Sequence, residues 1–326
     1  MCIKGELHSP YTTSEPSESS EVRMAVAITK APRMSRARRR ELFYGLLFAS
    51  PWLVGFVLWT VFPVLSSLYY SFTRYDLLRP PVFIGLTNYT NLLTDEDFFL
   101  VIKNTLWWVV LSAPTGVASA FLMAVLLNTK IFARSVFRAI FFFPSIVPVI
   151  VVSSVWAFVL NIQYGAINAT LRAFELPTIP FLSNPAYAKP TLLLINTWMQ
   201  GGAMVIFLAT LQDVPRELYD AATIDGASSW ARFWNITIPM CSPVILFNMV
   251  MAFIGGFQNF ALPWLLTQGG PNRATEFFSI FLYRNAFQYL RMGKASALAW
   301  ILFLVIVVFT VTLFKSSARW VYYRSE

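Results

Sequence analysis

The chain has 326 residues, of which 57% are hydrophobic, 17% aromatic and 13% charged. A soluble domain carries about 25% charged residues, so this chain has too few polar side chains to cover its own surface in water. The composition therefore excludes a soluble globular protein and predicts an integral membrane protein.

The formal net charge of +9 would favour nucleic-acid binding in a soluble protein. Here most ionisable residues lie between apolar blocks, so basic loops that orient the chain in a bilayer are the better interpretation. The two cysteines and the one histidine (Cys2, Cys241 and His8) form no cluster in the sequence. The sequence therefore predicts neither a disulfide framework nor a metal site.

Residues 1–40 differ in composition from the rest. The stretch Tyr11–Glu21 is rich in Ser, Thr, Glu and Pro, and Arg33–Arg40 is a basic run. Such a composition buries too little apolar area to order the chain, and the first apolar block is too long for a signal peptide. We expect residues 1–40 to be a disordered cytoplasmic basic tail and residues 41–326 to form one transmembrane domain.

Six windows without Asp, Glu, Lys or Arg follow, each long enough to cross a bilayer as a helix of roughly 20 residues. For the fifth window, prolines at its start and a Gly-Gly-Pro turn at its end favour a single span from about Ser242 to Leu266. The predicted fold class is all-α, a polytopic bundle of six transmembrane helices. The windows are Leu42–Thr73, Asn104–Thr129, Ala139–Leu171, Pro190–Gln212, Phe233–Asn272 and Ala295–Phe314.

The distribution of Lys and Arg favours cytoplasmic termini. With the tail inside, 16 of the 25 basic residues lie on the inner side, whereas without the tail the split is 8 to 9. The predicted orientation therefore depends on the tail.

The windows contain no ionisable group at membrane depth. Carriers coupled to protons or sodium usually hold Asp, Glu, His or Arg there, so a stand-alone secondary carrier is the weaker alternative. An enzyme acting on lipids is weaker still, because no acid–base pair or activated nucleophile is evident. The pair Gly293-Lys294 lacks the rest of a phosphate-loop pattern, so the chain has no nucleotide site of its own.

The loop between the fourth and fifth windows, residues 213–239, is predicted to form a short helix, a turn and a second short helix. Asp213 is the expected N-cap of the first helix, Gly226 its left-handed end, and Ser228 or Ser229 the start of a second helix that reaches Pro239. Four side chains share one face of the first helix at helical spacing, namely Leu218, Ala221, Ala222 and Asp225. A partner could approach this small-residue face closely, but a helix that merely covers the bundle fits the pattern equally well.

The segment Asp220–Ala227, followed after eight residues by Ile236–Pro239, resembles the EAA loop of binding-protein-dependent ABC importer permeases. Two positions depart from the family pattern, since Asp220 replaces Glu and Ile238 replaces Leu. The resemblance implies that this loop couples to a cytoplasmic ATPase. The residues it implicates are Glu217, Asp220, Ala221, Ala222, Asp225, Gly226, Ala227, Ile236 and Pro239.

The resemblance covers about residues 40 to 320 and narrows to carbohydrate-type permeases similar to the maltose MalF subunit. It implies a type I importer permease fold in the bacterial inner membrane, with no enzymatic activity in this chain. The implied partners are a second permease subunit, two ABC ATPases that hold ATP and Mg, an extracytoplasmic solute-binding protein and a sugar. Its supporting stretches are Tyr70–Thr73, Phe83–Tyr89, Tyr164–Asn168, Asn196–Trp198, Leu266–Asn272 and Ala295–Leu298.

A sugar presents hydroxyl groups and C–H faces, which amide and aromatic side chains match. Polar residues beside paired glycines in the fourth and fifth windows are candidates to line its path, although hydrogen bonds between helices and close packing explain them equally well. Glycerol-phosphate, the competing substrate, would favour cationic groups that the windows lack. The candidate path residues, most placed by the resemblance, are Ser145, Asn196, Gln200, Gly256, Gln258 and Asn259.

Two further expectations concern aromatic residues. The tryptophans Trp107, Trp108 and Trp156 are assigned to packing or to the interface belts. The segment Thr267–Lys294 alternates phenylalanine with charged residues, which predicts a helix lying at the membrane interface. The resemblance adds that this segment docks a solute-binding protein.

Overall fold

The computed structural model describes residues 36–129 and 132–322. Most of the expected tail, residues 1–35, lies outside the described residues, and residues 36–40 belong to the first helix. The chain divides into two compact units between Thr60 and Val61.

The described part of the first unit is helical. Helix α1 spans Arg36–Phe56 with Pro51 inside it, and a π-helical segment, η1, follows at Val57–Val61. Large apolar side chains such as Phe48 and Trp52 are exposed along it. Apolar side chains at a protein surface are stable against lipid or another chain rather than against water.

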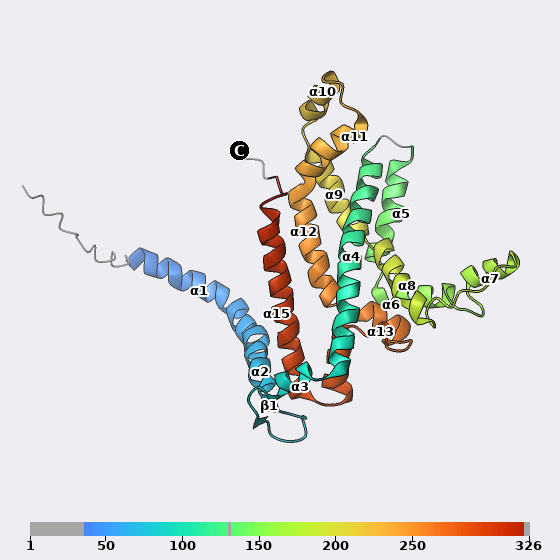
Figure 1. The fold of residues 1–326 in the computed structure, drawn as a ribbon. Coiled ribbons are helices and arrows are strands. Elements are labelled where there is room, and N and C mark those ends of the chain that lie inside the picture. The colour runs from blue at the N-terminus through green and yellow to red at the C-terminus, as the bar shows by residue number, and fades with distance from the viewer. Residues whose placement is uncertain (1–35, 130–131, 323–326) are drawn as a thin grey trace, which may run out of the picture. The chain divides into compact units, whose positions relative to one another are not determined.

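The second unit is built almost entirely of helices (Figure 1). In its described ranges two short strands, β1 (Thr73–Arg74) and β2 (Val82–Phe83), pair antiparallel with Thr73 opposite Phe83. Its helices are α2 (Phe62–Ser71), α3 (Thr87–Leu93), α4 (Glu96–Asn128), α5 (Arg134–Ile146), α6 (Val149–Val159), α7 (Ala166–Ala173), α8 (Pro185–Trp198), α9 (Gly201–Asp213), α10 (Arg216–Ile224), α11 (Ser229–Arg232), η2 (Phe233–Thr237), α12 (Ile238–Phe257), α13 (Ala261–Thr267), α14 (Phe278–Tyr283), η3 (Arg284–Gln288) and α15 (Met292–Ser317).

Within the described residues, four helical stretches are long and apolar enough to cross a membrane unbroken: Arg39–Ser71, Glu96–Asn128, Ser229–Phe257 and Met292–Ser317. Two further pairs qualify as bent spans, α5 with α6 at 101° and α8 with α9 at 44°. If each bent pair is one span, the total is the predicted six. Pro148 directly precedes α6 and Gly201-Gly202 opens α9, so both breaks lie at residues that interrupt helices.

The predicted bounds of the fifth span, Ser242 and Leu266, are both wrong. The helix runs from Ser229 through η2 into α12 and ends at Phe257, and α13 is a separate short helix. The wider π-helical turn of η2 ends at Thr237, and Pro239 is the second residue of α12. A widened turn relieves the clash between a proline ring and the preceding turn, so the helix passes through a residue expected to end it.

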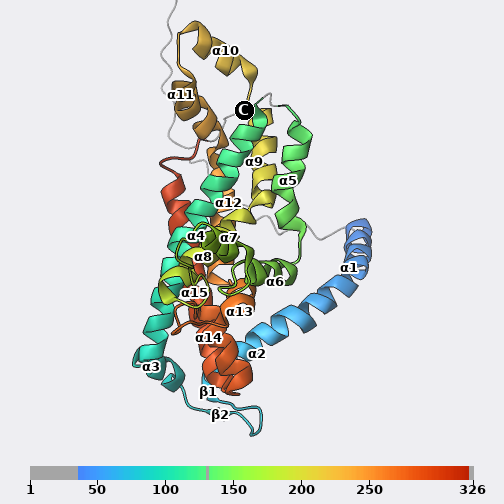
Figure 2. The same ribbon diagram turned by 90° about the vertical axis from the view of Figure 1, so that its right-hand side faces the viewer.

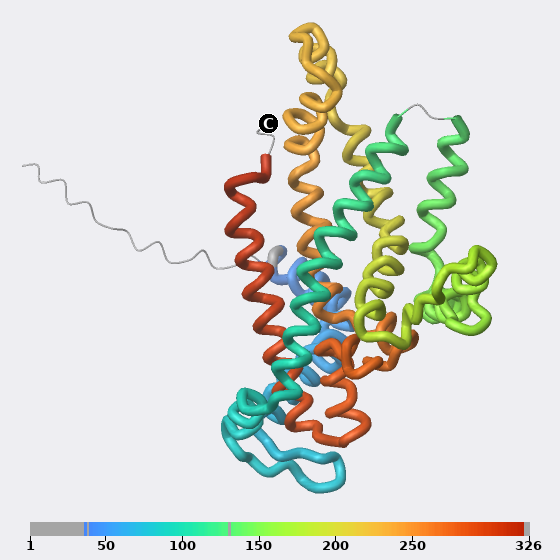
Figure 3. Tube along the Cα trace, turned by 45° about the vertical axis from the view of Figure 1, so that its right-hand side comes forward, coloured from blue at the N-terminus to red at the C-terminus, as the bar shows by residue number. Residues whose placement is uncertain are grey.

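Helix α4 lies at the centre of the second unit, in contact with α8, α9 and α12 (Figure 3). Its buried Gly116, Ala120 and Ala124 recur every four residues, which places small side chains on one face. Gly116 lies against the Gln200 side chain, where an added Cβ would be 3.2 Å from Cδ. Small residues let helix backbones approach closely, which stabilises helix pairs where water supplies no driving force.

Candidate functional site

Two features of the second unit match the predicted sites: the α10–α11 segment and a polar cavity between α4, α8 and α12. Helices α10 and α11 lie at one extremity of this unit (Figure 1). No residue of α10, all of which the structure describes, is buried, and the Ile224 side chain is 87% exposed. The segment is therefore available for contact with another molecule.

The predicted N-cap at Asp213 is wrong. Asp213 is the last residue of α9, Val214 is extended and buried, and Pro215 is the N-cap of α10. A residue before proline is held away from helical dihedral angles, so no helix can start at Val214. The prediction that Glu217 lies in the first turn is confirmed.

The predicted end of α10 is confirmed. Gly226 has φ of +76°, and the Ala227 N–H donates to the Ala222 carbonyl at 2.8 Å. This bond closes the helix in the way that a left-handed glycine permits. The Ser228 hydroxyl then accepts from the Ala231 N–H at 3.2 Å, which confirms a capped start for α11.

One side of α10 is tied to the following helix. The Tyr219 hydroxyl lies 3.0 Å from Thr237 Oγ1, and Arg232 Nη1 donates to Thr223 Oγ1 at 2.8 Å. Tyr219 and Thr223 are one turn apart, so both bonds hold the same face of α10.

The remaining candidate residues of the loop fall into two groups. Those on α10 and its turn lie on the surface or are half-buried, namely Glu217, Asp220, Ala221, Ala222, Asp225, Gly226 and Ala227. Ile236 instead packs against the apolar core, and Pro239 is half-buried in the first turn of α12. The loop therefore combines an exposed part with a part anchored in the bundle.

A polar cavity of about 240 Å³ lies between the spans. Asn196, Gln200 and Asn259 bring three amide groups to it from α8, from the break before α9 and from the end of α12. Its lining residues are Trp108, Ser112, Asn196, Gln200, Ala252, Gly255, Gly256 and Asn259. Four of the six candidate path residues are thus brought together.

The other two candidate path residues do not line this cavity. Ser145 lies in the last turn of α5, where its hydroxyl donates to the Phe142 carbonyl at 2.7 Å. Gln258 is the exposed C-cap residue of α12. Neighbours in sequence at a helix end point in different directions, so the run from Gly255 to Asn259 does not share one face.

Trp108 and Ser112 line the cavity but were not among the candidates. Trp108 was expected to pack, and it does: its side chain is 1% exposed and its ring centroid lies 5.2 Å from that of Phe277. Its Nε1 has no hydrogen-bond partner in the part of the chain that the structure describes. The spacing of four residues between Trp108 and Ser112 is the signal that places both on one face of α4.

The segment after α13 differs from the expected interfacial helix. Phe277, Phe278 and Phe281 are buried in the bundle rather than turned toward lipid, and α14 (labelled in Figure 2) contacts α4 and α15. Glu276 is 2% exposed and accepts from Arg273 Nε at 2.5 Å and Arg284 Nη1 at 2.6 Å. Paired charges and packed rings make this segment part of the folded core.

Two ion pairs hold the start of α4. Arg273 pairs with Asp97 as well as Glu276; burial alone would lower the pKa of Arg273, but these two carboxylates raise it above its usual value. Lys294 Nζ lies 2.7 Å from Asp95, the N-cap residue of α4. Burial opposes ionisation of Asp95, but the hydrogen bond and charge of Lys294 hold its pKa below 3.8.

Known proteins of similar sequence are components of membrane transport systems. Residues 116–323 match the family described as binding-protein-dependent transport system inner membrane component. The chain is 36% identical over 301 residues to the probable ABC transporter permease protein YesP of Bacillus subtilis, covering 91% of this chain and 97% of that one. It is 30% identical over 285 residues to the trehalose/maltose transport system permease protein MalF of Thermococcus litoralis, covering 86% and 96%.

Solved structures share the fold. A chain of a bacterial alginate ABC transporter, in complex with an alginate pentasaccharide-bound periplasmic protein, superposes with a TM-score of 0.76 at 24% identity. The match covers 86% of this chain and 96% of the other. This likeness confirms the predicted all-α membrane fold of an importer permease.

Proposed function

The chain belongs to the binding-protein-dependent transport system inner membrane components, and we propose that it is the permease subunit of an ATP-driven sugar importer. It would move a sugar or oligosaccharide across the cytoplasmic membrane by alternating access. The exposed α10, tied along one face to a helix that continues into the bundle, is the observation that carries this proposal.

Two hydrogen bonds and a continuous helix connect α10 to the polar cavity. Tyr219 and Thr223 link α10 to the stretch from Ser229 to Thr237, and that stretch is continuous with α12. The other end of α12 carries Gly256, which lines the polar cavity. A partner ATPase that displaces α10 would thus move a wall of the cavity as a rigid helix.

Three kinds of partner protein would complete the proposed transporter. Two ABC ATPases would grip the α10 segment of this chain and of a second permease, and would bind ATP and Mg themselves. An extracytoplasmic solute-binding protein would deliver the sugar at the opposite end. In this arrangement α10, and with it both termini, lies on the cytoplasmic side.

The cavity supports an uncharged or weakly charged cargo. Three amide side chains supply donors and acceptors, and the Trp108 indole carries an N–H donor. None of the described residues that line the cavity is ionisable. Amides suit hydroxyl groups, and an aromatic ring suits the C–H face of a sugar. A phosphorylated cargo would favour a basic lining, which weakens the glycerol-phosphate alternative.

The test is uptake of labelled sugar by the complete complex in proteoliposomes, with Gly226→Val compared with Gly85→Val. Both glycines have positive φ and open space around the missing Cβ, so each substitution strains the backbone of one turn by about 1–2 kcal/mol. Only Gly226 shapes the end of α10. We expect Gly226→Val to lower ATP-driven uptake by about tenfold or more, while Gly85→Val keeps it.

Two outcomes would refute the proposal. One is normal uptake by the assembled Gly226→Val complex. The other is gradient-driven flux through this chain alone, without ATPases, which would establish a secondary carrier.

A further inference from the structure

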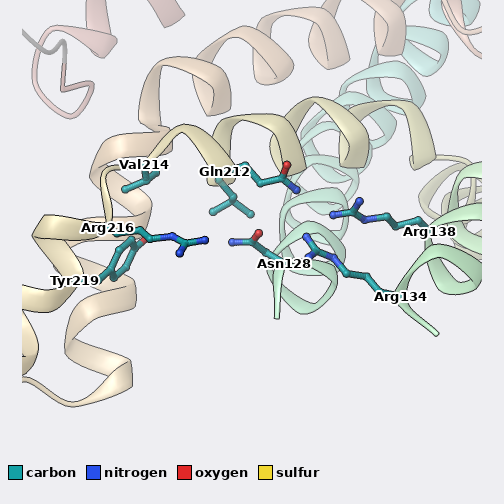
Figure 4. Close-up of a pocket in the computed structure, with 8 residues that line it drawn as sticks. Asn128, Arg134, Arg138, Gln212, Val214, Arg216 and Tyr219 are labelled. Atoms are coloured by element: carbon teal, nitrogen blue, oxygen red, sulfur yellow. The ribbon is translucent and has the colours of Figure 1, made fainter. Parts of the chain in front are cut away.

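A second polar pocket, distinct from the polar cavity between α4, α8 and α12, lies beside α10. It has a volume of about 570 Å³, and Figure 4 shows side chains from α4, α5, α9 and α10 pointing into it. Its lining residues are Asn128, Arg134, Arg138, Leu211, Gln212, Val214, Arg216 and Tyr219. The proposed function makes no use of this pocket.

The pocket concentrates positive charge. Three guanidinium groups, those of Arg134, Arg138 and Arg216, line it, and none of the lining residues is acidic. The ion pairs of the described chain involve other residues. Like charges gathered in one pocket repel one another unless an anion lies between them.

The arginine side chains have unused donors. With its amide oxygen toward them, Gln212 accepts from Arg138 Nη2 at 2.9 Å and from Arg134 Nη2 at 3.2 Å. The Nε atoms of Arg134 and Arg138 are buried, and neither has a hydrogen-bond partner among residues 36–129 and 132–322. One neutral oxygen thus meets two cations that can each donate up to five hydrogen bonds.

Oxyanion geometry suits these donors. A guanidinium group presents parallel N–H bonds that bind phosphate or carboxylate in a bidentate manner. Arg134 and Arg138 are one turn apart on α5, and Arg216 approaches from α10 (Figure 4). A phosphate group has several free oxygens, which can accept from Arg134 and Arg138 and leave a further acceptor facing Arg216.

The level of the pocket along the spans indicates where that phosphate comes from. Asn128 is the last residue of α4, Arg134 the first of α5, and Gln212 the penultimate residue of α9. All three helices belong to candidate spans, so the pocket lies where the hydrocarbon region ends. Lipid phosphate groups occupy this level, and basic pockets between spans on the cytoplasmic side bind anionic headgroups.

The outer surface of α5 offers a place for acyl chains. Val136, Ile140 and Phe143 are exposed, and helical spacing places them on the side of α5 away from Arg134 and Arg138. A lipid seated with its phosphate in the pocket can lay its chains along this apolar surface. We propose that the pocket binds the phosphate of an anionic phospholipid, which then links α5 to α10 through Arg216.

The test is retention of lipid by the full complex in native mass spectrometry, after detergent extraction and addition of phosphatidylglycerol or phosphatidylcholine. The variant is Arg134→Gln with Arg138→Gln. The control is Arg319→Gln, which removes an exposed charge just beyond the end of α15, at the same end of the unit. We expect bound phosphatidylglycerol to fall by about tenfold in the double variant and to remain in the control.

A second measurement keeps the test valid if the double variant fails to assemble. Arg216→Gln alters only an exposed residue of α10, and it should lower the increase in melting temperature that phosphatidylglycerol produces. Inorganic phosphate and phosphatidylcholine should produce no comparable increase in the unaltered complex.

Three results would overturn the proposal. The first is equal retention of phosphatidylglycerol by the unaltered complex and the double variant. The second is equal loss in Arg319→Gln, which would indicate attraction by net charge alone. The third is stabilisation by inorganic phosphate equal to that by phosphatidylglycerol, which would assign the pocket to a soluble anion.

Discussion

Arg284 donates from Nη1 to the buried carboxylate of Glu276 at 2.6 Å, while its Nη2 donates to the Gln268 carbonyl at 2.8 Å. The same carboxylate accepts from Arg273, whose own carbonyl accepts from Asn104 Nδ2 at 2.9 Å. Glu276 thereby connects the end of α13, the start of α14 and the N-terminal part of α4. A single buried charge organises the segment expected to lie at the membrane surface.

We predict that Glu276→Gln destabilises the protein by roughly 2–3 kcal/mol, below the range for fully buried pairs because both arginines are partly exposed. The substitution removes the carboxylate that both arginines share, so Arg284 loses its ion pair and Arg273 keeps only its pair with Asp97. Thermal unfolding of the purified complex measures the effect. Glu175→Gln is the matched control, since Glu175 is exposed and lies outside the loop of residues 213–239.

A double-mutant cycle with Arg284→Gln separates pairing from packing. We expect the two substitutions together to cost less than the sum of their separate effects, by about 1 kcal/mol or more. Additive effects would contradict a direct interaction between Glu276 and Arg284.

Substitutions at the two adjacent glycines that open α9 should have different effects on stability. A Cβ on Gly201 would lie 2.5 Å from the Phe141 carbonyl oxygen, whereas one on Gly202 meets no atom within 4 Å. Gly201→Ala should therefore push α9 from α5 and destabilise the protein by about 1–3 kcal/mol. Gly202→Ala should leave the melting temperature unchanged or raise it, because alanine favours helix by about 1 kcal/mol. Equal melting temperatures for the two variants would show that α5 and α9 do not pack this closely.

Stability should depend on pH through Asp95. Its pKa is lower in the folded protein than the usual 3.8, so the folded state favours the ionised carboxylate. The resulting stabilisation is complete above the unfolded pKa and is lost as the pH falls through the folded one. Melting temperatures from about pH 6 to pH 3 should fall more for the unaltered protein than for Asp95→Asn, which lacks this titration. Parallel pH profiles would refute the prediction.

The cavity residues should affect transport rather than stability. Asn196→Ala removes an amide from the cavity, and we expect the apparent KM for sugar uptake to rise by about tenfold, the equivalent of one hydrogen bond. Gln258→Ala is the control, because Gln258 is exposed and does not line the cavity. Equal KM values for the two variants would remove Asn196 from the substrate path.

Several features were predictable because they depend on local chemistry. The number of spans follows from the length of uncharged apolar stretches. The end of α10 follows from Gly226, because glycine has no Cβ and adopts the left-handed conformation without strain. The start of α10 was misplaced by two residues, because the extended conformation before Pro215 outweighs the capping tendency of Asp213. The start of the fifth span was misplaced because a π-helical turn lets the helix pass through Pro239.

The amino-acid sequence by itself determined the class of protein, its six apolar stretches and the loop that marks its family. Only the tertiary structure decided that Trp108 joins Asn196 and Asn259 at one cavity, that Glu276 is buried, and that Arg134 and Arg216 share a pocket. The physical reason is how far apart in sequence the interacting residues are. Hydropathy and turn conformation are set by neighbours in sequence, whereas a shared cavity requires packed helices to bring together residues that are far apart along the chain.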